Sequence, residues 1–225
     1  MKSVIIVLLL GVGLFIDQTI EFWGQTFTNV LIWLFFLWLL KSGNQTERVS
    51  LILCVVYATA GEMFLSLVWG LYEYRLHNIP LFVPPGHALL FTLGLLLAPK
   101  LPDKIIWWVP TVTAPYIIFA FVMGFDTMGG ILFLTFLFCL IFGKAKKLYA
   151  TMFVLSLILE IYGTMLGNWT WVFHVPWLGL TSTNPPVSAG AFYCLLDLLV
   201  VSSVGWMRSN TSTIVPSAVP LENEA

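Results

Sequence analysis

Eight apolar stretches divide the 225-residue chain, and each is close to the length that crosses a membrane. A helix needs about 20 mostly apolar residues to span roughly 30 Å of hydrocarbon. Only 9% of the residues are charged and the mean hydropathy is +0.94, whereas soluble domains carry about 25% charged residues. We therefore predict an all-α, polytopic membrane bundle with spans at 3–20, 24–40, 50–71, 87–100, 105–124, 128–143, 148–167 and 188–207.

The basic residues orient these predicted spans. Only Arg75 lies on one side, and the other nine lie at the termini and in the loops that follow even-numbered spans: Lys2, Lys41, Arg48, Lys100, Lys104, Lys144, Lys146, Lys147 and Arg208. Because lysine and arginine are retained in the cytoplasm during insertion, we predict cytoplasmic termini in a bacterial or archaeal cytoplasmic membrane. Residues 1–207 form one predicted transmembrane domain, and the polar tail 208–225 is expected to be disordered.

Several kinds of site are not predicted. Cys54, Cys139 and Cys194 lie inside apolar stretches without a CxxC or Cys/His spacing, which is typical of core cysteines. The three histidines lack the i, i+4 spacing of a metal site. The chain has no basic patch of the size that binds nucleic acid. We predict neither a metal nor a cofactor, and no nucleic-acid partner.

Two long segments share a series of landmarks. The first is GEMFLSLVWGLYEYRLHNIPLFVPPGH at 61–87, and the second is LEIYGTMLGNWTWVFHVPWLGLTSTNPPVSAGAFY at 159–193. Each has a glutamate inside a span, a hydroxyl residue four positions later, a tryptophan near the helix end, an aliphatic-proline pair and a Pro-Pro pair. Glu62 and Glu160 are 98 residues apart. This favours two parallel four-helix repeats, about 1–100 and 101–207, with chance similarity of apolar helices as the alternative.

Three carboxylic acids lie inside the predicted spans, and they are the candidate catalytic groups: Glu62, Glu160 and Asp197. A carboxylate near the bilayer centre costs about 2.5–3.5 kcal/mol on insertion scales, so it usually faces the bundle interior or a wet cavity. General acid or base chemistry is one use of such a group, and hydrogen bonding between helices is the alternative. We expect both glutamates to face one cavity, covered on the outer side by loops 72–86 and 168–187.

The candidate substrate-binding residues surround these acids. Helical spacing places Ser66 and Trp69 on the face of Glu62, and Thr164 on the face of Glu160. Arg75 is either an anion clamp or the partner of a loop ion pair with Glu73, and the aromatic residues are also typical of an interfacial belt. The whole set is Ser66, Trp69, Tyr72, Arg75, His77, His87, Thr164, Asn168, Trp169, Trp171, His174 and Asn184.

The stretch EIYGTMLGNWTW, followed by VPWLGL, carries a resemblance to a known family. It resembles the Glu-x-x-Gly-Thr-x-x-Gly pattern of integral-membrane carotenoid-synthesis proteins of the bisanhydrobacterioruberin hydratase type, which also have a trailing aromatic pair and a proline-containing loop. The first-half copy departs from the pattern, with Leu65 and Ser66 where Gly and Thr would stand. The resemblance implies a polyene or isoprenoid substrate and acid-assisted addition of water to a double bond, with Glu160 as proton donor.

Three classes of function are compatible with the sequence. The first is a membrane enzyme that acts on a lipid or isoprenoid through carboxylate acid/base chemistry in an intramembrane cavity. The second is a small proton-coupled permease, because parallel repeats with acids at the midplane also build transporters. The third is a non-catalytic protein of membrane assembly or lipid organisation. The bilayer is a partner in every case.

Overall fold

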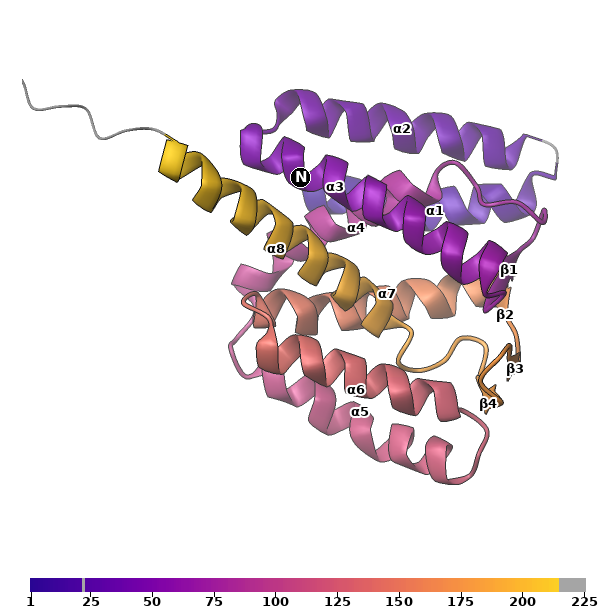
Figure 1. Ribbon diagram of the computed structural model, residues 1–225. Coiled ribbons are helices and arrows are strands. Elements are labelled where there is room, and N and C mark those ends of the chain that lie inside the picture. Colours follow the sequence, from indigo (N-terminus) through magenta and orange to yellow (C-terminus); the bar gives the residue numbers. More distant parts are fainter. Residues whose placement is uncertain (22, 215–225) are drawn as a thin grey trace, which may run out of the picture.

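The computed structural model describes residues 1–21 and 23–214, with side chains described as far as Ser209. It is a mostly helical bundle (Figure 1) with the helices α1 (Lys2–Thr19), α2 (Gly24–Ser42), α3 (Gln45–Glu62), α4 (Val83–Leu97), α5 (Ile105–Val122), α6 (Thr127–Phe142), α7 (Lys146–Leu166) and α8 (Gly190–Ile214). Within the described residues, six helical stretches are long and apolar enough to cross a membrane: Lys2–Thr19, Gly24–Ser42, Gln45–Val68, Ile105–Val122, Lys146–Leu166 and Gly190–Ser209.

Two helix boundaries differ from the prediction. Helix α4 begins at Val83, so Pro84 and Pro85 lie in its first turn, where the missing N–H removes no helical hydrogen bond. Helix α8 continues to Ile214. The prediction that the tail is disordered from residue 208 is therefore wrong for residues 208–214. The remaining part of the predicted tail, 215–225, lies outside the described residues.

The connections contain secondary structure that the all-α prediction left out. A π-helical segment, η1 (Met63–Val68), continues α3, and a 3-10 turn, η2 (Ala98–Lys100), follows α4. Strand β1 (Tyr72–Tyr74) pairs antiparallel with β2 (Trp169–Trp171), and β3 (His174–Val175) pairs with β4 (Leu180–Thr181). Strands of two or three residues leave little periodic signal in a sequence. All four lie at the end of the bundle opposite the N-terminus (Figure 1).

Helices α3, α4, α7 and α8 form the centre of the bundle. Helix α3 packs on α4 and α8, and α7 packs on the same two helices. The hairpin α1–α2 packs on α4, and the hairpin α5–α6 packs on α7. The β1–β2 ribbon therefore joins the connection after α3 to the connection after α7, directly over the central helices.

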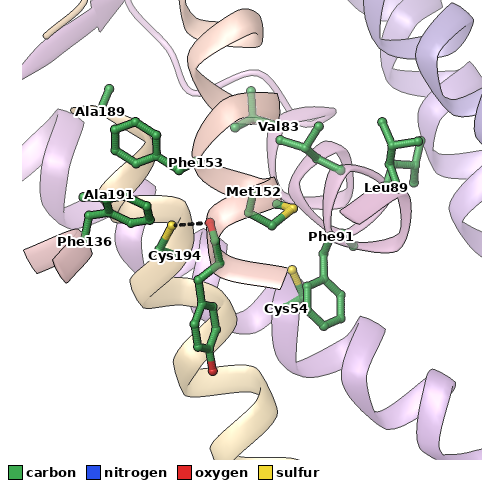
Figure 2. Packing of buried hydrophobic residues seen from close by; sticks show 14 of the residues in the cluster. Cys54, Val83, Leu89, Phe91, Phe136, Met152, Phe153, Ala189, Ala191 and Cys194 are labelled. Atoms are coloured by element: carbon green, nitrogen blue, oxygen red, sulfur yellow. Dashed lines mark hydrogen bonds between the residues drawn. The ribbon is translucent and has the colours of Figure 1, made fainter. Parts of the chain in front are cut away.

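Buried aromatic and sulfur side chains fill the contact between α6, α7 and α8 (Figure 2). The rings of Phe136 and Phe153 stack with centroids 4.1 Å apart. The thiol of Cys194 donates to the backbone carbonyl of Tyr149 at 3.2 Å. Cys54, Cys139 and Cys194 are all buried free thiols, which confirms their predicted place in the core.

Candidate functional site

Glu62 and Glu160 line the same interior cavity. Their exposed fractions are only 7% and 5%, and the cavity holds about 110 Å³. Its wall is mostly apolar and comes from α1, α2, α3, α4, α7, α8 and the β1–β2 ribbon. This is the arrangement of the two carboxyl groups that the sequence predicted.

The Glu62 carboxyl group is held by three side chains of its own half of the chain. The hydroxyl groups of Tyr72 and Tyr74 donate to Oε2 at 2.8 and 2.7 Å. His87 places Nε2 2.9 Å from Oε1. Burial, followed by the charge of Glu62, raises the pKa of both tyrosines well above the ordinary value of 10.0. Both phenols therefore stay protonated and remain hydrogen-bond donors.

The Glu160 carboxyl group has an equivalent but chemically different set of partners. The indole Nε1–H groups of Trp169 and Trp171 donate to Oε2 at 2.8 and 3.1 Å, and the Tyr193 hydroxyl donates to Oε1 at 2.9 Å. An indole N–H donates only. Oε2 is therefore occupied by two fixed donors, and a proton on Glu160 has to sit on Oε1.

Strand alternation aims these donors into the cavity. Successive side chains of a strand point to opposite faces, so Tyr72 and Tyr74 point inward while Glu73 points outward. Trp169 and Trp171 are buried in the same alternating pattern. The ribbon pairs the two sets, and the rings of Tyr72 and Trp171 lie 4.7 Å apart.

The two carboxyl groups are connected by a stacked pair of rings. His87 in α4 and Tyr193 in α8 stack with centroids 4.7 Å apart and an interplanar angle of 29°. Each ring also contacts the glutamate of its own half. The first half thus supplies an imidazole ring where the second half supplies a phenol. We call Glu62, His87, Tyr193 and Glu160 the central tetrad.

Two residues predicted on the Glu62 face do not line the cavity. Ser66 lies in the π-helical segment, whose wider turn breaks the i, i+4 spacing that placed it beside Glu62. Trp69 lies beyond that segment, where its indole donates to the Pro176 carbonyl at 3.0 Å and stacks on Trp177. On the other face, the Thr164 hydroxyl donates to the backbone carbonyl of Glu160. None of the three contacts the carboxyl groups.

Arg75 has a structural partner that the sequence did not indicate. Its Nη2 donates to the backbone carbonyl of Asp17 at 2.5 Å and lies 3.5 Å from the Asp17 carboxylate. The side-chain amide of Asn168 donates to the same carboxylate at 2.7 Å. The expected pair of Arg75 with Glu73 is wrong, and neither Arg75 nor Asn168 lines the cavity. This network instead fastens both strand connections to α1.

The remaining predicted binding residues lie outside the cavity. His77 contacts the exposed carboxylate of Glu73 at 2.5 Å, and His174 is exposed in β3. Asn184 accepts a hydrogen bond from the Trp171 backbone N–H, so it supports the ribbon. Of the twelve predicted binding residues, the cavity wall includes Tyr72, His87, Trp169 and Trp171.

Asp197 is separate from the two glutamates. Its side chain is fully buried in α8, and it is not part of the cavity wall. Neither carboxyl oxygen has a hydrogen-bond partner among the described residues. Asp197, predicted as a third candidate catalytic acid, therefore does not join the two glutamates at the cavity.

Sequence reasoning missed Tyr74 and Tyr193, although both donate directly to the carboxyl groups. The alternating sequence Tyr-Glu-Tyr at 72–74 is a signal for Tyr74, because it matches Trp-Thr-Trp at 169–171. Tyr193 has no local signal, since it reaches Glu160 from the next helix.

Gly163 makes room for one indole of the site. A Cβ added there would lie 2.0 Å from the Trp169 ring. We therefore expect Gly163→Ala to displace Trp169 from Glu160 and to cost about 1–3 kcal/mol of stability, the range for overpacked cores. Thermal unfolding in detergent measures this loss.

The matched control is Gly61→Ala, because a Cβ at Gly61 meets nothing within 4 Å. This variant is expected to unfold at or above the wild-type temperature, since alanine favours a helix over glycine. Equal melting temperatures for the two variants would contradict the close contact at Gly163.

No protein-family model, curated protein or solved structure matches this chain. Within the described residues, no group of three His, Cys, Asp or Glu side chains is placed to hold a metal ion.

Proposed function

We propose that this protein is a membrane enzyme that adds water to a double bond of an isoprenoid-type lipid. The observation that carries the proposal is the central tetrad: two buried carboxyl groups with different partners face one small, mostly apolar cavity. The motif resemblance at residues 160–171 suggests the same substrate class, but it implies Glu160 as the proton donor, whereas the proposal assigns that role to Glu62.

The proposed arrangement in the membrane has eight spans in two parallel repeats, with both termini cytoplasmic. The central helices support the repeat, because α3 packs on α4 as α7 packs on α8, and the cross pairs are α3 with α8 and α4 with α7. The orientation is supported by the basic residues, because nine of the ten lie at the termini and in the loops on one side, and Arg75, beside the β1–β2 ribbon, is the exception. The cavity then lies towards the outer side, under the β1–β2 ribbon.

The cavity size limits what part of a substrate it holds. An engineered cavity of about 150 Å³ binds benzene, so 110 Å³ accommodates one branched end of a chain and not a whole polyene. The apolar wall and the aromatic rings of the ribbon suit an isoprene unit. A group of this kind would enter with the rest of its chain outside the cavity.

The two glutamates take different roles in this proposal. Glu62 and His87 form the proton-donating pair, because Oε1 of Glu62 lies 2.9 Å from the imidazole Nε2 of His87. The proton adds to one alkene carbon and leaves positive charge on its neighbour. Glu160, whose Oε2 accepts two indole N–H groups, is the proposed anion that stabilises that charge together with the aromatic faces.

Water then completes the reaction. Its oxygen bonds to the positively charged carbon, and its spare proton returns to the Glu62–His87 pair. One water is consumed, the alkene becomes an alcohol, and the enzyme regains its starting state. No redox step is involved.

Mass spectrometry of lipid extracts tests the proposal. Cells that make acyclic isoprenoids would express the wild type or the Glu62→Gln, Glu160→Gln double variant. The wild type is expected to produce a species heavier by the mass of one water, and the double variant is not. Identical lipid profiles in a range of isoprenoid-producing cells would contradict the proposal.

A proton-coupled permease is the second candidate, and Asp197 is the observation that favours it. A buried acid without a described partner, midway along a span, is typical of proton pathways. Proton flux into liposomes that is lost with Asp197→Asn would favour a permease. Copurification with a partner, without flux or lipid change, would instead favour an assembly protein.

A further inference from the structure

A second cavity lies at the basic end of the bundle, away from the central tetrad. It holds about 470 Å³, which is within the size range of ligand sites. Its walls come from α1, α2, α3, α4 and α8 and from the connection before α7. The apolar part of its wall includes the buried residues Leu39, Leu51 and Phe91 and the partly buried residues Leu96, Val201 and Val204.

The rim of this cavity is positively charged. Lys2, Lys144 and Arg208 line it, together with a single carboxylate, Glu47. The Glu47 carboxylate is already used in the capping box of α3, where it accepts the Asn44 backbone N–H at 2.8 Å. The rim therefore carries a net charge of about +2 above an apolar interior, a pattern typical of sites for anionic lipid heads.

We infer that this cavity binds one anionic phospholipid, with its phosphate at the three cations and an acyl chain in the apolar interior. Hydroxyl groups of Thr46, Ser50 and Thr92 also line the cavity, and they extend its polar part. Lys2 belongs to the first half of the chain, whereas Lys144 and Arg208 belong to the second. The lipid would thus join the two halves at the end opposite the β1–β2 ribbon.

Lipid retention tests this inference. The full-length protein would be purified in detergent with equal amounts of phosphatidylglycerol and phosphatidylcholine, and the bound lipid quantified by mass spectrometry. Each net positive charge is expected to favour the anionic lipid by roughly fivefold, so two net charges predict a preference of roughly 25-fold for phosphatidylglycerol. The Lys2→Gln, Lys144→Gln, Arg208→Gln triple variant is expected to lose this preference. Phosphatidylglycerol should also raise the melting temperature of the wild type but not of the triple variant.

Two further variants separate the site from general surface charge. A second triple variant removes three cations that do not line the cavity: Lys41→Gln, Lys100→Gln, Lys104→Gln. It should retain the preference for phosphatidylglycerol. Gly205→Leu adds an apolar side chain to the cavity wall without changing charge, because Gly205 lines the cavity and a Cβ there meets nothing within 4 Å, and it should bind less lipid of both kinds.

Three results would overturn the inference. They are equal retention of both lipids by the wild type, the same loss in both triple variants, and full phosphatidylglycerol binding by Gly205→Leu. Displacement of the lipid by inorganic phosphate would show a free-anion site instead. None of these results depends on enzyme activity, so they leave the proposed hydration untouched.

Discussion

Replacing Glu62 by glutamine is expected to lower formation of the hydrated product by about 10²–10⁴-fold, the usual contribution of a general acid. Glutamine keeps the shape of the side chain. Its carbonyl oxygen can accept the hydroxyl hydrogens of Tyr72 and Tyr74, while its amide group faces His87. The variant retains its hydrogen-bond partners but has no acidic proton to donate. Initial rates with matched amounts of folded protein in nanodiscs would measure the loss.

The control for this experiment is Glu73→Gln. Glu73 lies between the same two tyrosines but points outward to His77, so its loss should leave the rate unchanged. Glu160→Gln should also be slow, because the amide cannot stabilise positive charge, while the protein stays folded. Full activity of Glu62→Gln, with product still formed by the wild type, would remove Glu62 from the proposed mechanism.

Replacing Asp17 by alanine is expected to have the largest effect on stability. The Asp17 side chain is 2% exposed and accepts the Asn168 amide, with Arg75 nearby. Its removal leaves a buried amide without its partner and a partly buried cation without its counter-charge. Breaking such a pair costs about 3–5 kcal/mol. We expect about 3 kcal/mol, the lower end of that range, because Arg75 keeps its bond to the Asp17 carbonyl.

Thermal unfolding in detergent measures this effect, and Glu73→Ala is its matched control. The Glu73 carboxylate also has a partner, the His77 ring, but both side chains are exposed, and exposed pairs contribute about 0–1 kcal/mol. If the two alanine variants unfold at the same temperature, the Asp17 network does not hold the strand connections to α1.

The sequence predicted the helices and the two central carboxyl groups for a common reason. Apolar composition identifies helices that cross a membrane. A glutamate inside such a stretch indicates a buried site, because inserting a carboxylate into the bilayer costs free energy. The shared cavity was predicted because Glu62 and Glu160 occupy matching positions in two similar segments. The aromatic donors on β2 were also found, because Trp169 and Trp171 follow the glutamate closely.

The errors arose where the backbone departs from an ideal helix or where contacts are distant in sequence. The π-helical segment displaced Ser66 and Trp69 from the face on which regular spacing put them. Arg75 reaches Asp17 across 58 positions, and Tyr193 reaches Glu160 from another helix. Helical or strand periodicity does not indicate such pairs, so sequence reasoning pairs Arg75 with the nearby Glu73 and misses Tyr193.

The hydrogen-bond partners of Glu62 and those of Glu160 come from different halves of the chain, and this affects how mutations act on the site. Among the described residues, the side chains hydrogen-bonded to the Glu62 carboxyl group come from the first half of the chain, and those hydrogen-bonded to the Glu160 carboxyl group come from the second. A mutation at Tyr74, for example, alters the surroundings of one acid and leaves the direct partners of the other in place. If the two halves are repeats, as proposed, the surroundings of each acid could therefore change independently of the other.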